Sequence, residues 1–230
     1  MKTNDIKTYL VAGLMSGLLC SPLASASESN IVPPDRISVF KVPLQCLAAP
    51  QIGCGSRAKP ILLELKRNSS VSEAWLNRAG TRIAVVWKPE SNVEDRGKVA
   101  TKLEEQNATE VQGQSREETL KDFSSGKGWY RGAEVDRLSE EEAGIIAARL
   151  VRRVEAKTTL PRKKAEALER ALAGAIARRT TDDKFTPDKD TVLKLEAGLP
   201  QLAGKYLDKD QIPIFKVAIA AGWAPLPNEK

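Results

Sequence analysis

The sequence predicts an α+β fold, in which a β-α-β-β-α-β half at residues 37–112 precedes a helical half at residues 139–225. The first half alternates β-branched or aromatic runs with segments that have the apolar spacing of a helix. The second half carries helical spacing only, and a stretch rich in Gly, Ser and charge separates the two at residues 113–138. The composition, with 41% hydrophobic and 29% charged residues, is that of a globular chain. We therefore expect folded cores in both halves.

Residues 1–26 have the features of a secretory signal. A positive start leads into an apolar run at residues 10–19, and Ala-Ser-Ala at residues 24–26 supplies a small-residue cleavage site. The apolar run is shorter than the roughly 20 residues that span a bilayer. We expect a periplasmic or secreted protein that does not span a membrane, with a short leader at residues 27–36.

The first elements of the β-α-β-β-α-β half follow from local patterns. Residues 37–43 favour a strand, because β-branched and aromatic side chains dominate them. Residues 57–67 repeat apolar side chains one turn apart, which predicts a helix with Pro60 in its first turn. Residues 71–76 and 81–87 then favour two strands joined by a tight turn, which indicates a hairpin.

A second helix at residues 92–106 and a short strand at residues 108–112 complete the order β-α-β-β-α-β. That order is typical of the ferredoxin-like fold, in which two helices cover one face of an antiparallel sheet. Residues 113–138, with Gly126-Lys127-Gly128 at their centre, are expected to be a linker or irregular structure.

Four helices are expected in residues 139–225, and a small bundle is their natural packing. The first begins with a capping box formed by Ser139 and Glu142, and an apolar stripe follows it. Gly198 and Pro200 are expected to interrupt the third helix. The three later helices are marked by Pro161, by Thr186-Pro187 and by residues 214–221.

The chain contains no histidine. Ser-His-Asp and Cys-His nucleophile systems are therefore excluded, since both need an imidazole to carry the proton. The commonest zinc ligand is missing as well. The net charge of +6 is mild, and the basic stretch from Arg149 to Arg179 is interleaved with glutamates. We expect that stretch to be a solvated helix surface and not a nucleic-acid site.

The two cysteines of the mature chain are the candidate site. Cys46 and Cys54 lie in the loop between the first strand and the first helix, and Cys54 comes directly before that helix. Because a helix N-terminus stabilises negative charge, we expect a lowered pKa for the Cys54 thiol. Thiolates bind soft ions such as copper(I) or mercury(II). The competing interpretation is a disulfide between the two, which an oxidising compartment favours and which contributes about 2.6 kcal/mol at most.

Three stretches carry a resemblance to a known family: residues 54–62 (CGSRAKPIL), 71–77 (VSEAWLN) and 81–87 (TRIAVVW). They resemble the heavy-metal-associated domain, the family of small copper chaperones and of the periplasmic mercuric-ion-binding protein. The resemblance covers residues 37–112 and none of the helical half. It implies a ferredoxin-like fold with a metal-binding CxxC before the first helix. Only Cys54 matches that motif, because Gln51 stands where the first cysteine would be and Cys46 is the nearest other thiol.

Together these observations favour a non-enzymatic protein that binds or transfers copper(I) or mercury(II) through Cys54 and Cys46. The alternative is an interaction or assembly module that kept the fold, lost the metal and locked its loop with a disulfide. The helical half is expected to dock to a protein partner. Ser56 and Lys59 have the spacing of a serine nucleophile and its lysine base, but helix capping is the ordinary role of such a serine.

Overall fold

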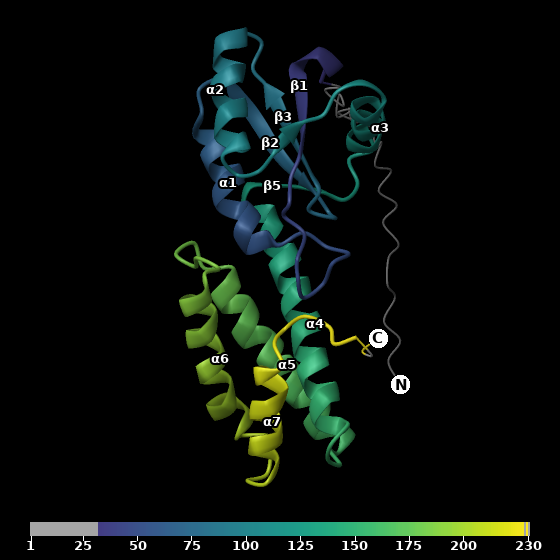
Figure 1. Ribbon diagram of the computed structural model, residues 1–230, viewed down its shortest axis with the longest axis vertical. Helices are drawn as coiled ribbons and strands as arrows, with labels where there is room; N and C mark the ends of the chain where they lie inside the picture. The colour runs from purple at the N-terminus through teal and green to yellow at the C-terminus, as the bar shows by residue number, and fades with distance from the viewer. Residues whose placement is uncertain (1–31, 228, 230) are drawn as a thin grey trace, which may run out of the picture. The chain divides into compact units, whose positions relative to one another are not determined.

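The computed structural model describes residues 32–227 and residue 229 (Figure 1). The secretory signal predicted at residues 1–26 lies outside the described residues, as does the start of the leader at residues 27–36. Within the described residues the chain forms seven α-helices and one five-stranded antiparallel sheet. The prediction of a mixed α and β fold is therefore confirmed.

The sheet has the strand order β4-β1-β3-β2-β5, and each neighbouring pair is antiparallel. Strands β1 and β3 lie in the middle, and the predicted hairpin joins β2 to β3. Both edge strands are very short, which limits the backbone that is open to pairing with another chain. The strands span Ile37–Lys41 (β1), Val71–Asn77 (β2), Arg82–Trp87 (β3), Thr109–Glu110 (β4) and Trp129–Arg131 (β5).

Helices α1 (Gly55–Arg67) and α2 (Val93–Glu104) cover one face of the sheet. Alternate residues of β3 point to this face, and among them Trp87 is fully buried and donates its indole N–H to Ser38 Oγ at 3.1 Å. Helix α1 begins earlier than predicted, because Ala58 already donates its N–H to the carbonyl of Cys54. Pro60 consequently lies inside the helix and not in its first turn.

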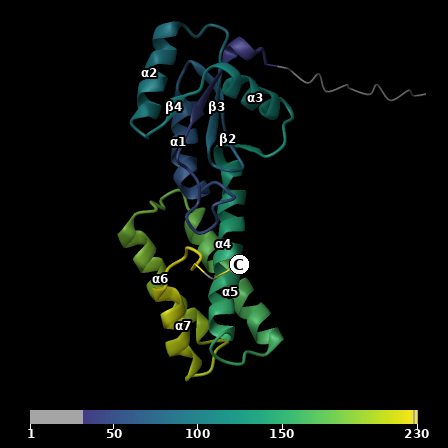
Figure 2. The ribbon, with the colours of Figure 1, turned by 45° about the vertical axis from the view of Figure 1, so that its right-hand side comes forward.

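Helix α3 (Gly113–Ser124) covers the opposite face of the sheet, as Figures 1 and 2 show. It belongs to the segment 113–138, for which we expected a linker or irregular structure, and β5 and the short 3-10 helix Gly132–Val135 follow it there. The physical reason is that β1 and β3 are apolar on both faces, so the second face also needs a cover. Leu120 and Phe123 of α3 provide it, together with Trp129.

A bundle of four helices follows, formed by α4 (Asp136–Glu155), α5 (Arg162–Thr180), α6 (Lys189–Ala203) and α7 (Gln211–Ala220). Helix α5 begins directly after Pro161, as predicted. None of the helices in the described part of the chain combines the length and the apolar character needed to cross a bilayer.

Two details of the bundle correct the sequence prediction. Ser139 and Glu142 do not form a capping box, because α4 already begins at Asp136 and both residues lie buried inside it. Helix α6 continues through Gly198 and Pro200 without interruption, and Asp188 caps its start by accepting the N–H of Thr191 at 2.8 Å. Tertiary packing therefore overrides local breaking signals in this part of the chain.

Helix α4 connects the sheet to the bundle. Its first turns contact α1, and its remaining length packs against α5 and α7. The loop after β1 packs on α4 as well, so that Cys46, Ile52 and Cys54 share one apolar core with residues such as Ile146 and Leu172 of the bundle. The cysteine-bearing loop is thereby placed against the helical half and away from the sheet face that α1 and α2 cover.

Candidate functional site

The loop between β1 and α1 folds back on itself and brings the two cysteines to one side. Gln45 and Gly53 form an antiparallel β-bridge, and Cys54 donates its N–H to the carbonyl of Leu44 at 2.7 Å. Side chains alternate along paired segments, and diagonal neighbours across such a pair share a face. Cys46 and Cys54 are diagonal neighbours here. The loop therefore presents both thiols to the same surface.

Two glycines hold this loop against the β2–β3 turn. A Cβ on Gly53 would lie 2.9 Å from Gly80 Cα, so no side chain fits between them. Gly80 has a φ of 68°, which glycine adopts at no steric cost. Gly53 also donates its N–H to the carbonyl of Arg78 at 2.7 Å. The position of the cysteine loop is thus fixed by the hairpin of the sheet as well as by α4.

Both thiols are buried. Cys46 is 3% exposed and Cys54 is 8% exposed, and side chains of α4 such as Ala143 and Ala147 belong to the same core. Cys54 is the N-cap residue of α1, which is the position that the sequence indicated. Its sulfur lies 3.4 Å from Ser56 Oγ. Cys46 accepts the N–H of Ala49 on its sulfur at 3.3 Å.

The expected lowering of the Cys54 pKa is wrong. Burial raises the pKa of the Cys54 thiol, and the carboxylate of Glu142 raises it further, while hydrogen bonds from Ser56 and from the backbone of Arg57 lower it only in part. Burial and Glu142 also raise the pKa of Cys46 strongly. The cost of placing a thiolate among apolar side chains thus exceeds the stabilisation that the helix N-terminus supplies.

Glu142 of α4 is the third acid of this site, and sequence reasoning assigned it to a cap. Burial raises the pKa of its carboxyl, and a hydrogen bond with Cys46 opposes that rise. We call Cys46, Cys54 and Glu142 the thiol cluster. A signal for Glu142 was present in the sequence, because it lies one turn before Ile146 on the apolar stripe of α4. The partners of Glu142 could not be read from that spacing.

The thiol cluster could form a disulfide or bind a soft cation, and both reactions require the thiols to lose their protons. Both cysteines are free thiols in this structure. Oxidation to a disulfide passes two protons and two electrons to an external disulfide and leaves no charge behind, which suits a buried place. Binding a soft cation requires thiolates instead. No group of three or more Cys, Asp or Glu side chains in the described part of the chain is placed to hold a metal ion.

Lys59 does not form the dyad with Ser56 that the spacing suggested. Its ammonium lies 2.9 Å from Asp136 Oδ2, 2.9 Å from the carbonyl of Thr181 and 2.5 Å from Asp183 Oδ1. We call these four residues the lysine cluster. It joins α1 to the first turn of α4 and to the loop after α5. No local signal indicated it, because Asp136 and Thr181 lie 77 and 122 positions from Lys59.

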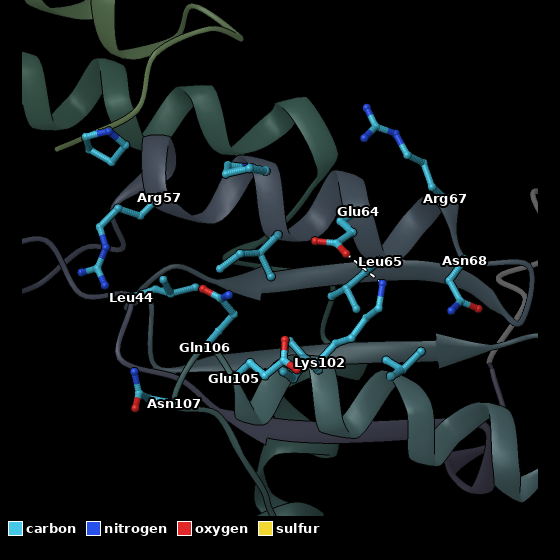
Figure 3. A pocket seen from close by; sticks show the side chains of 15 residues that line it. Leu44, Arg57, Glu64, Leu65, Arg67, Asn68, Lys102, Glu105, Gln106 and Asn107 are labelled. Atoms are coloured by element: carbon cyan, nitrogen blue, oxygen red, sulfur yellow. Dashed lines mark hydrogen bonds and ion pairs between the residues drawn. The ribbon is translucent and has the colours of Figure 1, made fainter. Parts of the chain in front are cut away.

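A groove with a volume of about 710 Å³ lies between α1 and α2 (Figure 3). Its rim carries charges of both signs, including Arg57, Arg67 and Glu105. Lys102 forms an ion pair with Glu64 across the groove, with 3.0 Å between Nζ and Oε1. The sequence predicted both helices but not the space between them, which depends on their packing. The apolar part of its lining consists of Leu44, Pro60, Ile61, Leu65, Val99, Leu103 and Pro187.

We compared the chain with models of protein families, with curated proteins and with solved structures. None of the three comparisons gave a match. The resemblance to the heavy-metal-associated domain therefore stays a prediction.

Proposed function

We propose that this protein is an exported, non-enzymatic interaction or assembly module in which Cys46 and Cys54 close a disulfide. One observation carries the proposal: both sulfurs lie on the same face of the folded-back loop, and both are buried beneath α4. An external disulfide of the oxidising compartment accepts the two electrons and two protons by thiol–disulfide exchange, and an apolar bridge then replaces the two buried thiols. Closing this loop contributes about 2.6 kcal/mol at most by the loop-entropy estimate. The bridge would fix the loop that connects β1 to α1 and packs on α4.

A ferredoxin-like fold for residues 37–112 is part of this proposal. The chain order β1-α1-β2-β3-α2-β4 supports it, as does the placement of α1 and α2 on one face of the sheet. Strand β5 and helix α3 are additions to that pattern. A periplasmic or secreted location is also part of the proposal, since a disulfide persists in an oxidising compartment.

The groove between α1 and α2 supports a binding role. Its volume of about 710 Å³ lies within the range of known ligand sites. Its lining combines apolar side chains with charges of both signs, so it suits a partner that is itself amphipathic. Docking of a protein partner through the helical half stays a prediction, and the proposal does not depend on it.

The redox state of the cysteines tests the proposal. The full chain is exported from a bacterial host, unfolded without reductant and treated with an alkylating reagent before its intact mass is measured. We expect no alkylation of Cys46 or Cys54, and two added groups after prior reduction. The Cys46→Ser variant is the control, because its remaining thiol at Cys54 must be alkylated without reductant. Alkylation of both cysteines in the untreated protein would refute the disulfide.

Soft-metal binding through Cys54 and Cys46 is the second candidate function. The shared face of the two sulfurs favours it, because thiolates are the preferred ligands of copper(I) and mercury(II). Binding has to displace protons from thiols whose pKa values are raised by burial and by Glu142. We therefore expect the affinity to increase with pH.

Titration of the reduced protein with copper(I) at pH 6 and at pH 8 tests this second candidate. Binding that is tighter at pH 8 and is lost in the Cys54→Ser variant would support it. Equal copper binding by the protein and by Cys54→Ser would exclude it.

A further inference from the structure

Arg153 of α4 binds the C-terminal tail, which we define as residues 222–227 together with Glu229. Its guanidinium donates to the carbonyl of Ala218 at 3.0 Å, of Gly222 at 2.5 Å and of Ala224 at 2.9 Å. The same group forms a two-pronged pair with the Glu229 carboxylate, with N–O distances of 2.6 and 2.8 Å. Only 8% of the Arg153 side chain is exposed. The tail is therefore held by a buried cation and not by a surface ion pair.

Arg149, one turn earlier on α4, connects this tail to the cysteine loop. Its Nη1 donates both to the carbonyl of Trp223 and to the carbonyl of Ala48, the latter at 2.8 Å. Ala48 lies two residues after Cys46. One buried guanidinium nitrogen thus holds the tail and the loop together. Figures 1 and 2 show the tail, in yellow, leaving the end of α7 and crossing α4.

The same contacts help to cover the thiols. Ala48 and Ala49 are buried in the same core as Cys46, whereas Leu47 beside them is 83% exposed, so the loop packs its alanines inward and turns Leu47 outward. Trp223 packs against the core that contains both cysteines. If the tail detaches, Arg149 loses the Trp223 carbonyl and the nearby Glu229 carboxylate, whose Oε2 lies 3.9 Å from Arg149 Nε. The loop then keeps fewer of the contacts that hold it on α4.

We propose that the C-terminal tail is a clasp that controls the access of reagents and partners to Cys46 and Cys54. This inference rests on the proposed function of the cysteine pair, because it describes how that pair is opened and closed. With the clasp closed, Arg149 holds the loop on α4, and the sulfurs stay covered. With the clasp open, the loop can leave α4 and uncover the sulfurs, which then exchange with an external disulfide that forms the bridge or with an external dithiol that reduces it.

The charge of Glu229 determines how the clasp opens. The hydrogen bonds from Arg153 lower the pKa of the Glu229 carboxyl to about 2, against the smaller opposing effect of burial. A carboxyl with a lowered pKa contributes its stabilisation above its unfolded value, and that contribution is lost only as the pH falls toward about 2. Near neutral pH the Glu229 carboxylate is therefore ionised. The clasp then opens when this carboxylate moves away from Arg153, and not because Glu229 takes up a proton.

The reactivity of the thiols in the folded, fully reduced chain tests the clasp. A small aromatic disulfide reagent is added under native conditions, and the rate of thiol release is measured for the protein and for Arg153→Gln. We expect a rate increase of about tenfold, which corresponds to about 1.4 kcal/mol less free energy for local opening. The matched control is Arg152→Gln, because Arg152 is the exposed neighbour on the same helix and is expected to leave the rate unchanged.

Glu229→Gln supplies a second test that leaves α4 intact, so it applies even if Arg153→Gln fails to fold. It removes the charge of the acceptor and is expected to increase the rate about threefold, since hydrogen bonds between charged groups are roughly twice as strong as neutral ones. Equal rates in the protein and in Glu229→Gln would overturn the clasp. An equal increase in Arg152→Gln would also overturn it, because the effect would then be general loosening. Since the assay uses reduced protein, a disulfide that never forms would refute the proposed function without affecting this result.

Discussion

Two polar clusters lie where α1 meets α4, and they differ in how their charges are paired. The lysine cluster surrounds Lys59 with two carboxylates and a carbonyl oxygen, so its charges are matched. The thiol cluster contains three acidic groups, Cys46, Cys54 and Glu142, and no lysine or arginine forms an ion pair with any of them in the described part of the chain. The thiol cluster is buried throughout, whereas the Asp183 side chain of the lysine cluster is 78% exposed, so the two clusters differ in burial as well as in their partners.

The consequence is seen in the pKa values. Burial lowers the pKa of Lys59, but hydrogen bonds to Asp183 and Asp136 raise this pKa more. The pKa of Lys59 is therefore raised overall, and the ammonium stays charged. In the thiol cluster burial raises the pKa of each acid, and the two thiols keep their protons while Glu142 accepts a hydrogen bond from Cys46. The lysine cluster, in which opposite charges are paired, therefore stabilises the contact between α1 and α4. In the thiol cluster, which contains acids only, loss of protons, oxidation or cation binding changes the stability of the fold.

The largest expected effect comes from removing the cation of the lysine cluster. Lys59→Met leaves the partly buried Asp136 without its partner, and breaking such a pair costs about 3 kcal/mol. Urea unfolding followed by circular dichroism measures the loss. Lys66→Met is the control, because Lys66 is mostly exposed and its pair with Glu73 is expected to contribute less than about 1 kcal/mol. A similar loss in both variants would contradict the distinction drawn between the two clusters.

A smaller effect is expected from alkaline pH on the reduced protein. Thiols ionise in the unfolded chain above pH 9.0, whereas Cys46 and Cys54 stay protonated in the fold because their pKa values are raised. The unfolded state then binds fewer protons than the folded state, so stability falls as the pH rises past 9.0, by up to about 1.4 kcal/mol per pH unit for each thiol that keeps its proton. Unfolding free energies between about pH 9 and 11 measure this slope. The oxidised protein is expected to lack it, and equal slopes in both forms would mean that the thiols are not protected.

The smallest effect is expected from Glu142→Gln. Glu142 has a raised pKa in the fold, so it destabilises the folded state progressively as the pH rises above its unfolded value of 4.5. Glutamine keeps an oxygen that can accept the hydrogen bond from Cys46 and removes the titration. We expect a gain of roughly 1 kcal/mol at pH 7 and no gain at pH 4. A variant that is less stable than the protein at pH 7 would show that the carboxylate is stabilising.

Much of the first half could be predicted from local patterns. The strands at residues 37–43, 71–76 and 81–87 and both helices between residues 57 and 106 were placed within a few residues of their observed bounds. Periodicity suffices for these elements because each presents an apolar face to one core. The continuous apolar run of β3 was also a signal that both faces of the sheet are covered. The cover, α3, was missed because its own sequence is polar and its apolar contacts are few.

The candidate site could be predicted only in part. Sequence placed Cys54 at the start of α1 and paired it with Cys46, and the structure brings both to one face of the same loop. The predicted lowering of the Cys54 pKa was wrong. The helix N-terminus can be read from neighbouring residues, whereas burial under α4 depends on residues far away in the chain. The metal, the disulfide and the family resemblance stay predictions that the experiments above address.

By itself the sequence determined the order β-α-β-β-α-β of residues 37–112, the absence of imidazole chemistry and the position of one cysteine before a helix. These properties depend on residue identity and on spacings of a few positions. Only the tertiary structure decided that α4 covers both thiols, that Glu142 joins them and that Arg149 ties their loop to the tail. The physical reason is that burial and electrostatic pairing depend on contacts between residues far apart in the chain, which local periodicity does not encode.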